Sequence, residues 1–171
     1  MFLKKDGDHE WHSIDATIVR AHQHASGPQG GQDKQALGKS RGGLSSKIHM
    51  KVDAFGMPLE FVLTGGQVHE ASQVDFLVNE HSDYMIADRG YDSDKIREMC
   101  RNKGIEPVIP GRKCRKELIS YDEHIYKERN LVERFFCRIK QFRRIATRYD
   151  KTAIMFRGAL TLVSIILWLQ V

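Results

Sequence analysis

The chain has 171 residues, 41% of them hydrophobic, which is enough for one domain with a substantial core, and no change in composition indicates a second. The net charge of +5 and the pI near 9.2 favour a polyanionic partner, although many basic proteins share these values. Three cysteines without C-x-x-C spacing argue against a disulfide framework or a cysteine zinc site. They are typical of free thiols in a reducing cytoplasm.

Neither end of the sequence predicts a secreted or membrane protein. The N-terminal stretch MFLKKDGDHEWH has no apolar run long enough for a signal peptide. Near the C-terminus, Arg157 and Gly158 interrupt an apolar stretch, and the remaining run, Ala159 to Leu169, is shorter than the roughly 20 residues that a membrane span needs. We therefore expect a core helix there, a cytoplasmic protein and no membrane partner.

The first predicted strand runs from Ser13 to Val19, where apolar and polar residues alternate. Aspartate is disfavoured within strands, so Asp15 is either an edge residue that faces water or a functional residue. A glycine-rich loop is expected from Ser26 to Gly43. Cations around Gly42 could bind a phosphate there, although a solvated loop has the same composition. These cations are Lys39, Arg41 and Lys47.

Ser46 to Asp53 and Pro58 to Thr64 predict a hairpin, because apolar residues alternate on both arms and AFGMP supplies the turn. Asp53 is a rival candidate for a functional carboxylate. Its place at the entrance of the turn favours a local hydrogen-bonding role instead. A helix is expected from about Ala71 to Glu80.

The short apolar run from Tyr84 to Ala87 predicts a central strand that ends at Asp88. A carboxylate at the exit of a central strand lies where open α/β sheets bind their ligands; the alternative is an Asp that caps a turn. Ser93 is expected to be the N-cap of a helix from Asp94 to Lys103. A last strand is predicted from Glu106 to Pro110, at an edge that tolerates its prolines.

Two further clusters of polar residues are less specific. The basic loop from Arg112 to Lys116 would contact phosphates through Arg112 and Lys113 if the protein handles DNA; otherwise it is a solubilising surface. Four histidines gather early in the sequence, but no cysteine or carboxylate lies at the spacing that would complete a zinc site. These are His9, His12, His22 and His24.

The stretch YKERNLVERFFCRIK predicts an amphipathic helix. Helical spacing places four polar residues on one narrow face: Tyr126, Arg129, Glu133 and Lys140. The apolar residues of the opposite side are Leu131, Val132, Phe135, Ile139 and Phe142. Further cations lie nearby in the sequence, namely Arg134, Arg138, Arg143, Arg144 and Arg148. For an arbitrary helix of this kind, a solvated basic surface is the alternative.

The pattern Tyr126-x2-Arg129-x3-Glu133-x6-Lys140 resembles the sequence around the last catalytic carboxylate of DDE-type bacterial insertion-sequence transposases. The resemblance extends to SIDATIVRAH, GKSRGGLSSKIH and ADRGYDSD, and it is greatest to the insertion-sequence-five family. It implies one ribonuclease H-like α/β domain over residues 1–171, with a mixed five-stranded sheet flanked by helices. The predicted order of three strands, helix, strand, helix, strand and two helices agrees with that fold.

The resemblance also implies a catalytic triad of Asp15, Asp88 and Glu133, which would hold Mg²⁺, with Mn²⁺ as a substitute. Two such ions about 3.5–4 Å apart supply the nucleophile and stabilise the leaving oxygen in phosphodiester cleavage. The expected substrate is double-stranded DNA, as element ends and as target. Hydrolysis at the ends would free a 3′-hydroxyl that attacks the target, and the other matching residues, Tyr126, Arg129 and Lys140, would contact the DNA backbone or help to position the site.

One departure from the family is that Asp15 lies almost at the start, where a helical DNA-binding region is usual. The chain therefore resembles the catalytic half alone, and its candidate partners include an N-terminal transposase fragment and a second copy, as a homodimer on DNA. Two alternatives remain open. One is a catalytically incompetent remnant that binds DNA or full-length transposase and regulates transposition; the other is a ribonuclease or repair nuclease.

Overall fold

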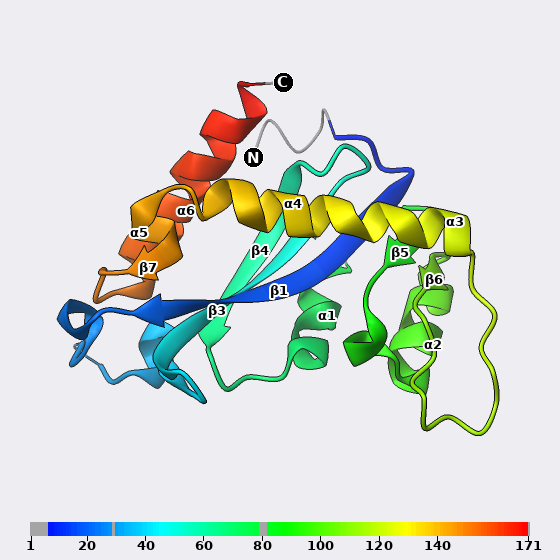
Figure 1. Ribbon diagram of the computed structural model, residues 1–171, viewed down its shortest axis with the longest axis horizontal. Coiled ribbons are helices and arrows are strands. Elements are labelled where there is room, and N and C mark those ends of the chain that lie inside the picture. The colour runs from blue at the N-terminus through cyan, green and yellow to red at the C-terminus, as the bar shows by residue number, and fades with distance from the viewer. Residues whose placement is uncertain (1–6, 29, 79–81, 171) are drawn as a thin grey trace.

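A computed structural model describes residues 7–28, 30–78 and 82–170, which form a mixed sheet with helices on both faces (Figure 1). Five strands lie side by side in the order β4-β3-β1-β5-β6. Strand β3 is antiparallel to β1 and β4, whereas β5 is parallel to β1 and β6. Their bounds are β1 Trp11–Ala21, β3 Gly43–Val52, β4 Pro58–Gly65, β5 Tyr84–Ile86 and β6 Glu106–Val108. The predicted ribonuclease H-like arrangement is confirmed.

The described residues form a sheet of seven strands, two more than the five predicted. Strand β2 (Gly38–Ser40) forms within the expected loop by pairing with β3, and the same loop contains the 3₁₀ turns η2 (Gln23–Ala25) and η3 (Asp33–Gln35). Strand β7 (Thr147–Arg148) pairs with the end of β1. Both strands are too short for an alternating pattern, so only their pairing partners reveal them.

The predicted helices occur in the predicted order, and the structure adds the one-turn helix α5 (Arg143–Ala146) before the last of them. In place of a single helix from Ala71 to Glu80, the structure has the 3₁₀ turn η4 (Glu70–Gln73) and the one-turn helix α1 (Val74–Leu77). Glu80 lies outside the described residues. The remaining helical segments are η5 Arg89–Tyr91, α2 Asp94–Asn102, α3 Glu123–Tyr126, η6 Lys127–Arg129, α4 Asn130–Ile139, α5 Arg143–Ala146 and α6 Ala153–Trp168. Ser93 caps α2 as predicted, since its side chain accepts a hydrogen bond from the Ile96 amide.

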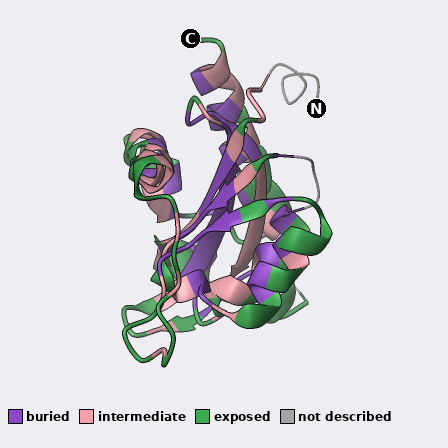
Figure 2. Cartoon of the chain, turned by 90° about the vertical axis from the view of Figure 1, so that its right-hand side faces the viewer, coloured by how far each residue is buried: buried purple, intermediate pink, exposed green. Residues whose placement is uncertain are grey.

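Two apolar clusters fix the helices to opposite faces of the sheet (Figure 2). On one face, α4 and α6 bury residues such as Phe135 and Leu160 against Ile48 and Met50 of β3. On the other face, α1 and α2 pack against Ile14 of β1 and Met85 of β5. Among the helices that the structure describes, including apolar α6, none combines the length and the hydropathy that a membrane crossing requires.

Strand β1 has an incomplete set of neighbours along one edge. It pairs with β3 from Ser13 to Arg20. On its other edge it pairs with β5 only over Trp11 to Ser13 and with β7 only over Arg20 and Ala21. Residues 14–19 therefore have no strand partner on that edge among the strands described. Asp15 lies in this part of β1, where groups from both faces of the sheet can approach it.

Two acidic residues have structural roles inside the protein. Asp53 accepts hydrogen bonds from the amides of Phe55 and Met57 at 3.0 and 2.7 Å, which confirms its predicted local role in the turn. Asp92 is buried and its oxygens accept from Arg97, Arg115 and the Arg112 amide, at distances between 2.7 and 3.0 Å. The predicted basic loop is therefore held to the start of α2 by an internal carboxylate.

Asp92 should make the stability of the protein depend on acidic pH. Burial opposes its ionisation, but the hydrogen bonds from Arg115, Arg112 and Arg97 lower its pKa from the ordinary 3.8 to about 2. A depressed carboxyl pKa stabilises the folded state above the unfolded pKa and loses that effect as the pH falls through the folded value. We expect about 2 kcal/mol of the unfolding free energy to disappear between pH 4 and pH 2. Urea unfolding across this range should show a shallower decline for Asp92→Asn, and equal declines would contradict the assignment.

Arg148 was named among the cations near the basic helix, but its side chain is fully buried and does not belong to the surface. Its guanidinium donates to the carbonyls of Asp150 and Ala36 at 2.9 and 3.2 Å and to Ser46 Oγ at 2.7 Å. These bonds connect β7 to β3 and to the loop before β2. Arg148 is consequently a structural residue, unlike the exposed Arg134, Arg143 and Arg144.

Candidate active site

Asp15 lies in β1, and Asp88 follows the end of the neighbouring parallel strand β5 at the same level of the sheet. The last paired residues of β1 and β5 are Ser13 and Ile86, and each carboxylate lies two residues further along its chain. Residues two apart in a strand point to the same face, so both aspartates are placed on the face that α4 covers. Asp88 is also the N-cap of η5, since its Oδ1 accepts from the Gly90 amide at 2.7 Å.

The environment of Asp15 disfavours its negative charge. Burial raises the pKa of Asp15 from 3.8 to about 6, a hydrogen bond from the Ala16 amide opposes this shift, and the charge of Asp88 adds to it. The Ala16 amide donates to Asp15 Oδ1 at 2.7 Å. Two carboxylates within electrostatic reach of one another in a partly dehydrated site are a suitable place for a cation.

Glu133 faces Asp15 across one arginine. Segments α3, η6 and α4 follow one another directly from Glu123 to Ile139, and η6 and α4 lie against β1 (Figure 1). Arg129 Nη2 lies 2.5 Å from Glu133 Oε1, and Arg129 Nη1 lies 3.5 Å from Asp15 Oδ2. The guanidinium therefore holds the third carboxylate on the same side of the sheet as Asp15.

Lys140 and Tyr126 lie at either end of this helical face. Lys140 Nζ donates to Thr17 Oγ1 at 2.6 Å, which places its charge on β1 two residues beyond Asp15. The guanidinium carbon of Arg129 lies 5.9 Å from the centre of the Tyr126 ring. Arg129 and Lys140 thus contact β1 directly, and Tyr126 and Glu133 lie beside Arg129.

The donor set suits a hard divalent cation in part. Mg²⁺ prefers carboxylate oxygens and retains several water molecules, so Asp15 and Asp88 fit this requirement from adjacent strands. In residues 7–28, 30–78 and 82–170, no three His, Cys, Asp or Glu side chains lie close enough together to hold a metal ion. Glu133, which is half-exposed at 52%, is bonded to Arg129 in this arrangement. The early histidines likewise form separate pairs, His9 with His12 at the start of β1 and His22 with His24 after its end.

The other predicted DNA-binding cations differ in their surroundings. Lys39, Arg41 and Lys113 are exposed. Arg112 donates to the carbonyls of Arg89 and Gly90 at 3.2 and 2.8 Å, so its guanidinium rests against the turn that follows Asp88. Lys47 is buried, at 7% exposure, and its ammonium binds inside the protein rather than facing solvent.

Two residues near the carboxylates were missed by sequence reasoning. The pKa of Tyr91 is raised by burial and then by the charges of Asp15, Glu70 and Asp88. The charge of Glu70 also contributes to the raised pKa of Asp15. Glu70 lies in a polar turn without a distinctive spacing. Tyr91 belongs to the segment ADRGYDSD, whose aspartates are the more obvious candidates for a functional role.

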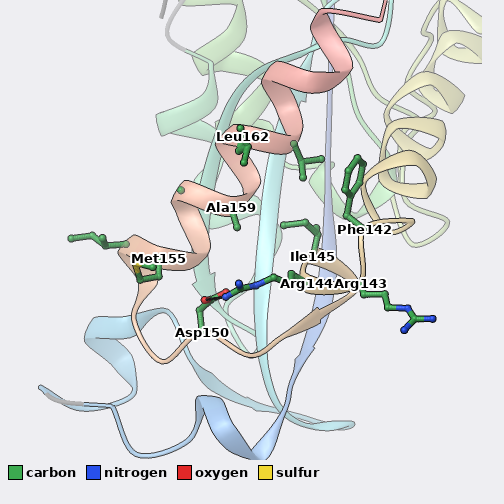
Figure 3. A pocket seen from close by; sticks show the side chains of 11 residues that line it. Phe142, Arg143, Arg144, Ile145, Asp150, Met155, Ala159 and Leu162 are labelled. Carbon is green, nitrogen blue, oxygen red and sulfur yellow. Dashed lines mark hydrogen bonds and ion pairs between the residues drawn. The ribbon is translucent and has the colours of Figure 1, made fainter.

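An apolar pocket of about 650 Å³ lies elsewhere, between α5 and α6 (Figure 3). Phe142, Ile145, Met155, Ala159 and Leu162 line it, with the Arg144–Asp150 ion pair at one end. None of the predicted site residues contributes to its walls. The pocket is therefore separate from the carboxylate site.

The fold and the placement of its carboxylates define the class of protein as a ribonuclease H-like α/β domain. The family described as Transposase DDE domain matches residues 7–169, and the chain belongs to this family of transposase catalytic-type domains. The recognition of a DDE-type transposase from sequence is confirmed at that level.

Curated relatives are consistent with this membership. The transposase for insertion sequence element IS6501 of Brucella ovis is 33% identical over 130 residues, covering 74% of this chain and all of that protein. The transposase for insertion sequence element IS402 of Burkholderia cepacia is 33% identical over 121 residues, covering 63% of this chain and 55% of that protein.

Two solved structures are more distant. The catalytic core domain of BIV integrase is 14% identical, with a TM-score of 0.46, over 92% of this chain and 82% of that one. The piggyBac transposase in a synaptic complex with hairpin DNA is 13% identical, with a TM-score of 0.45, over 66% of this chain and 25% of that one.

Proposed function

We propose that this chain is the catalytic domain of a DNA transposase of the insertion-sequence-five type, with Asp15, Asp88 and Glu133 as its catalytic carboxylates. One observation carries the proposal. Adjacent parallel strands bring Asp15 and Asp88 to one level of the sheet, and α4 presents Glu133 over the same face. Asp15 and Asp88 would form the site of DNA cleavage and strand transfer, and Glu133, which is linked to Asp15 through Arg129, would complete it.

Mg²⁺, with Mn²⁺ as a substitute, is the proposed cofactor, and when bound it would supply an activated oxygen nucleophile and relieve charge at the scissile phosphate. Asp15 would bind it from a strand, which is a rigid element, and Asp88 from the N-cap of η5 directly after β5. Glu133 would join them by exchanging Arg129 for the cation. An exposed carboxylate in an i, i+4 ion pair can do this readily, because such pairs stabilise a helix by only about 0.3–0.5 kcal/mol.

Double-stranded DNA is the proposed substrate, both as element ends and as target. Lys140, Tyr126 and Arg129 surround the carboxylates and would bind phosphates of the strand being cut. Water would cleave at the element end, and the 3′-hydroxyl that is released would attack the target strand. A homodimer on DNA and an N-terminal transposase fragment that recognises the ends remain proposed partners.

The second candidate is the catalytically incompetent regulator of transposition. It is favoured by the position of Arg129, which contacts both Asp15 and Glu133 and so compensates part of their negative charge without a metal. In that case the same basic face would bind DNA or full-length transposase, but no cleavage would follow.

Calorimetric titration of Mn²⁺ into the full chain separates the two functions. We expect binding to the wild type and at least tenfold weaker binding to Asp15→Asn and Asp88→Asn, because each variant removes a charged ligand. Circular dichroism should confirm that the variants are folded. Binding that is equally tight in both variants would place the metal elsewhere and contradict the catalytic proposal, whereas a folded wild type that binds no Mn²⁺ would favour the regulator.

A further inference from the structure

A lysine and a glutamate form an ion pair on the face of the sheet opposite α4. Lys47 pairs with Ile18 of β1 in the sheet, and its Nζ donates to the carbonyl of Val68 at 2.8 Å and to Glu70 Oε1 at 3.2 Å. The ammonium is nearly buried, with a side-chain exposure of 9%, so both acceptors are needed to offset its lost hydration. This pair fixes the Glu70 carboxylate at the start of η4.

Tyr91 provides a second, independent feature of the same place. Its ring packs with Ile14 and Val74 in the core and is 1% exposed. Among the described residues its hydroxyl has no hydrogen-bond partner. Buried hydroxyls nearly always have one, because an unpaired polar group in the interior destabilises the folded state. A group from outside the chain, such as an ordered water, is therefore expected beside it.

The edge of β1 that carries Asp15 is open on the side of β5 and β7. Residues 14–19 lack a strand partner on that edge, because β5 stops at Ile86 and β7 begins to pair only at Arg20. The turns η4 and η5, which carry Glu70 and Tyr91, pack against one another. The charges of Asp15, Glu70 and Asp88 all act on the Tyr91 hydroxyl, which is consistent with a shared polar site.

We propose that Glu70 and Tyr91 are positioning residues of the active site, which bind the water shell of a divalent cation held by Asp15 and Asp88. This inference rests on the proposed function. Mg²⁺ keeps several of its waters when proteins bind it, and these waters need acceptors around the site. The Glu70 carboxylate accepts hydrogen bonds, and the Tyr91 hydroxyl can accept or donate one. Lys47 would fix the position of Glu70 for this purpose. This role replaces the phosphate contact that was expected of Lys47 from the sequence.

The test compares Mn²⁺ binding and thermal unfolding of the full chain in four variants. Glu70→Gln and Tyr91→Phe remove the proposed outer groups. Asp75→Asn removes an exposed carboxylate on the adjacent helix α1, and Tyr84→Phe removes a hydroxyl from β5. Loss of outer partners weakens metal affinity by about 10- to 100-fold, so we expect at least tenfold weaker Mn²⁺ binding for the first two variants and unchanged binding for the controls.

Tyr91→Phe gives a further readout that does not depend on activity. Without metal it should melt at or above the temperature of the wild type, since it deletes a buried hydroxyl that has no partner in the protein. With Mn²⁺ its melting temperature should rise by less than that of the wild type, because weaker binding stabilises the folded state less. A lower melting temperature without metal would show that the hydroxyl has an internal partner and would overturn its role.

The outcomes also separate this inference from the function on which it rests. If Asp15→Asn weakens Mn²⁺ binding while Glu70→Gln and Tyr91→Phe bind like the wild type, the positioning role is overturned and the catalytic proposal stands. If Asp15→Asn and Asp88→Asn bind as tightly as the wild type, the catalytic proposal fails and the inference fails with it. Weaker Mn²⁺ binding in Asp15→Asn, Asp88→Asn, Glu70→Gln and Tyr91→Phe supports both the catalytic proposal and the positioning role.

Discussion

Asp88→Asn should reduce metal-dependent nicking of DNA by more than about 100-fold while leaving the protein folded. Outer partners of a metal site already contribute about 10- to 100-fold, so loss of a direct ligand should exceed that range. The fold should persist because Asn retains the oxygen that accepts from the Gly90 amide in η5. Glu133→Gln should behave in the same way, since its ion pair with Arg129 is half-exposed and contributes little to stability.

Nicking of supercoiled plasmid in Mn²⁺ measures this effect, and urea unfolding of the same samples checks the fold. Glu123→Gln is a matched control, because it removes an exposed carboxylate from the start of the same helical stretch. We expect the control to retain wild-type activity. Nicking that survives both Asp88→Asn and Glu133→Gln would remove these carboxylates from the reaction.

Arg148→Leu should destabilise the folded state by about 3–5 kcal/mol, a large part of the 5–15 kcal/mol that is usual for a domain. The guanidinium is fully buried, and burial lowers its pKa to about 10 while Asp150 opposes the shift. Its removal would leave Ser46 Oγ and the Ala36 and Asp150 carbonyls with fewer donors in the interior. The attachment of β7 to β1 should weaken with them.

Arg144→Ala is the appropriate control for this variant. Arg144 also binds Asp150, at 2.5 Å, but its side chain is 66% exposed, so we expect a loss below about 1 kcal/mol. Chemical denaturation at neutral pH would give both free energies of unfolding. Equal, small losses in the two variants would show that the interior bonds of Arg148 do not stabilise the fold.

The local elements were largely predictable from sequence, since they depend on periodicity and on short-range hydrogen bonds. Alternating residues predicted β1 and the β3–β4 hairpin, and Ser93 and Asp53 have the capping and turn roles that their positions indicate. The helical face from Tyr126 to Lys140 was visible for the same reason. Strands β2 and β7 were not, because a strand of two or three residues exists only through its partner.

The residues of the candidate site also differ in whether their positions depend on local sequence or on tertiary contacts. Sequence determined that Asp15 lies in a strand, that Asp88 follows one and that Glu133 and Lys140 share a helical face, because each of these facts is local. Only the tertiary structure decided that Lys47 and Arg148 are interior cations, and that Glu70 and Tyr91 lie near Asp15. These facts depend on the pairing of β1 with its neighbours and on the open edge between β5 and β7. Burial and charge proximity arise from contacts between distant segments, and no spacing within the chain encodes them.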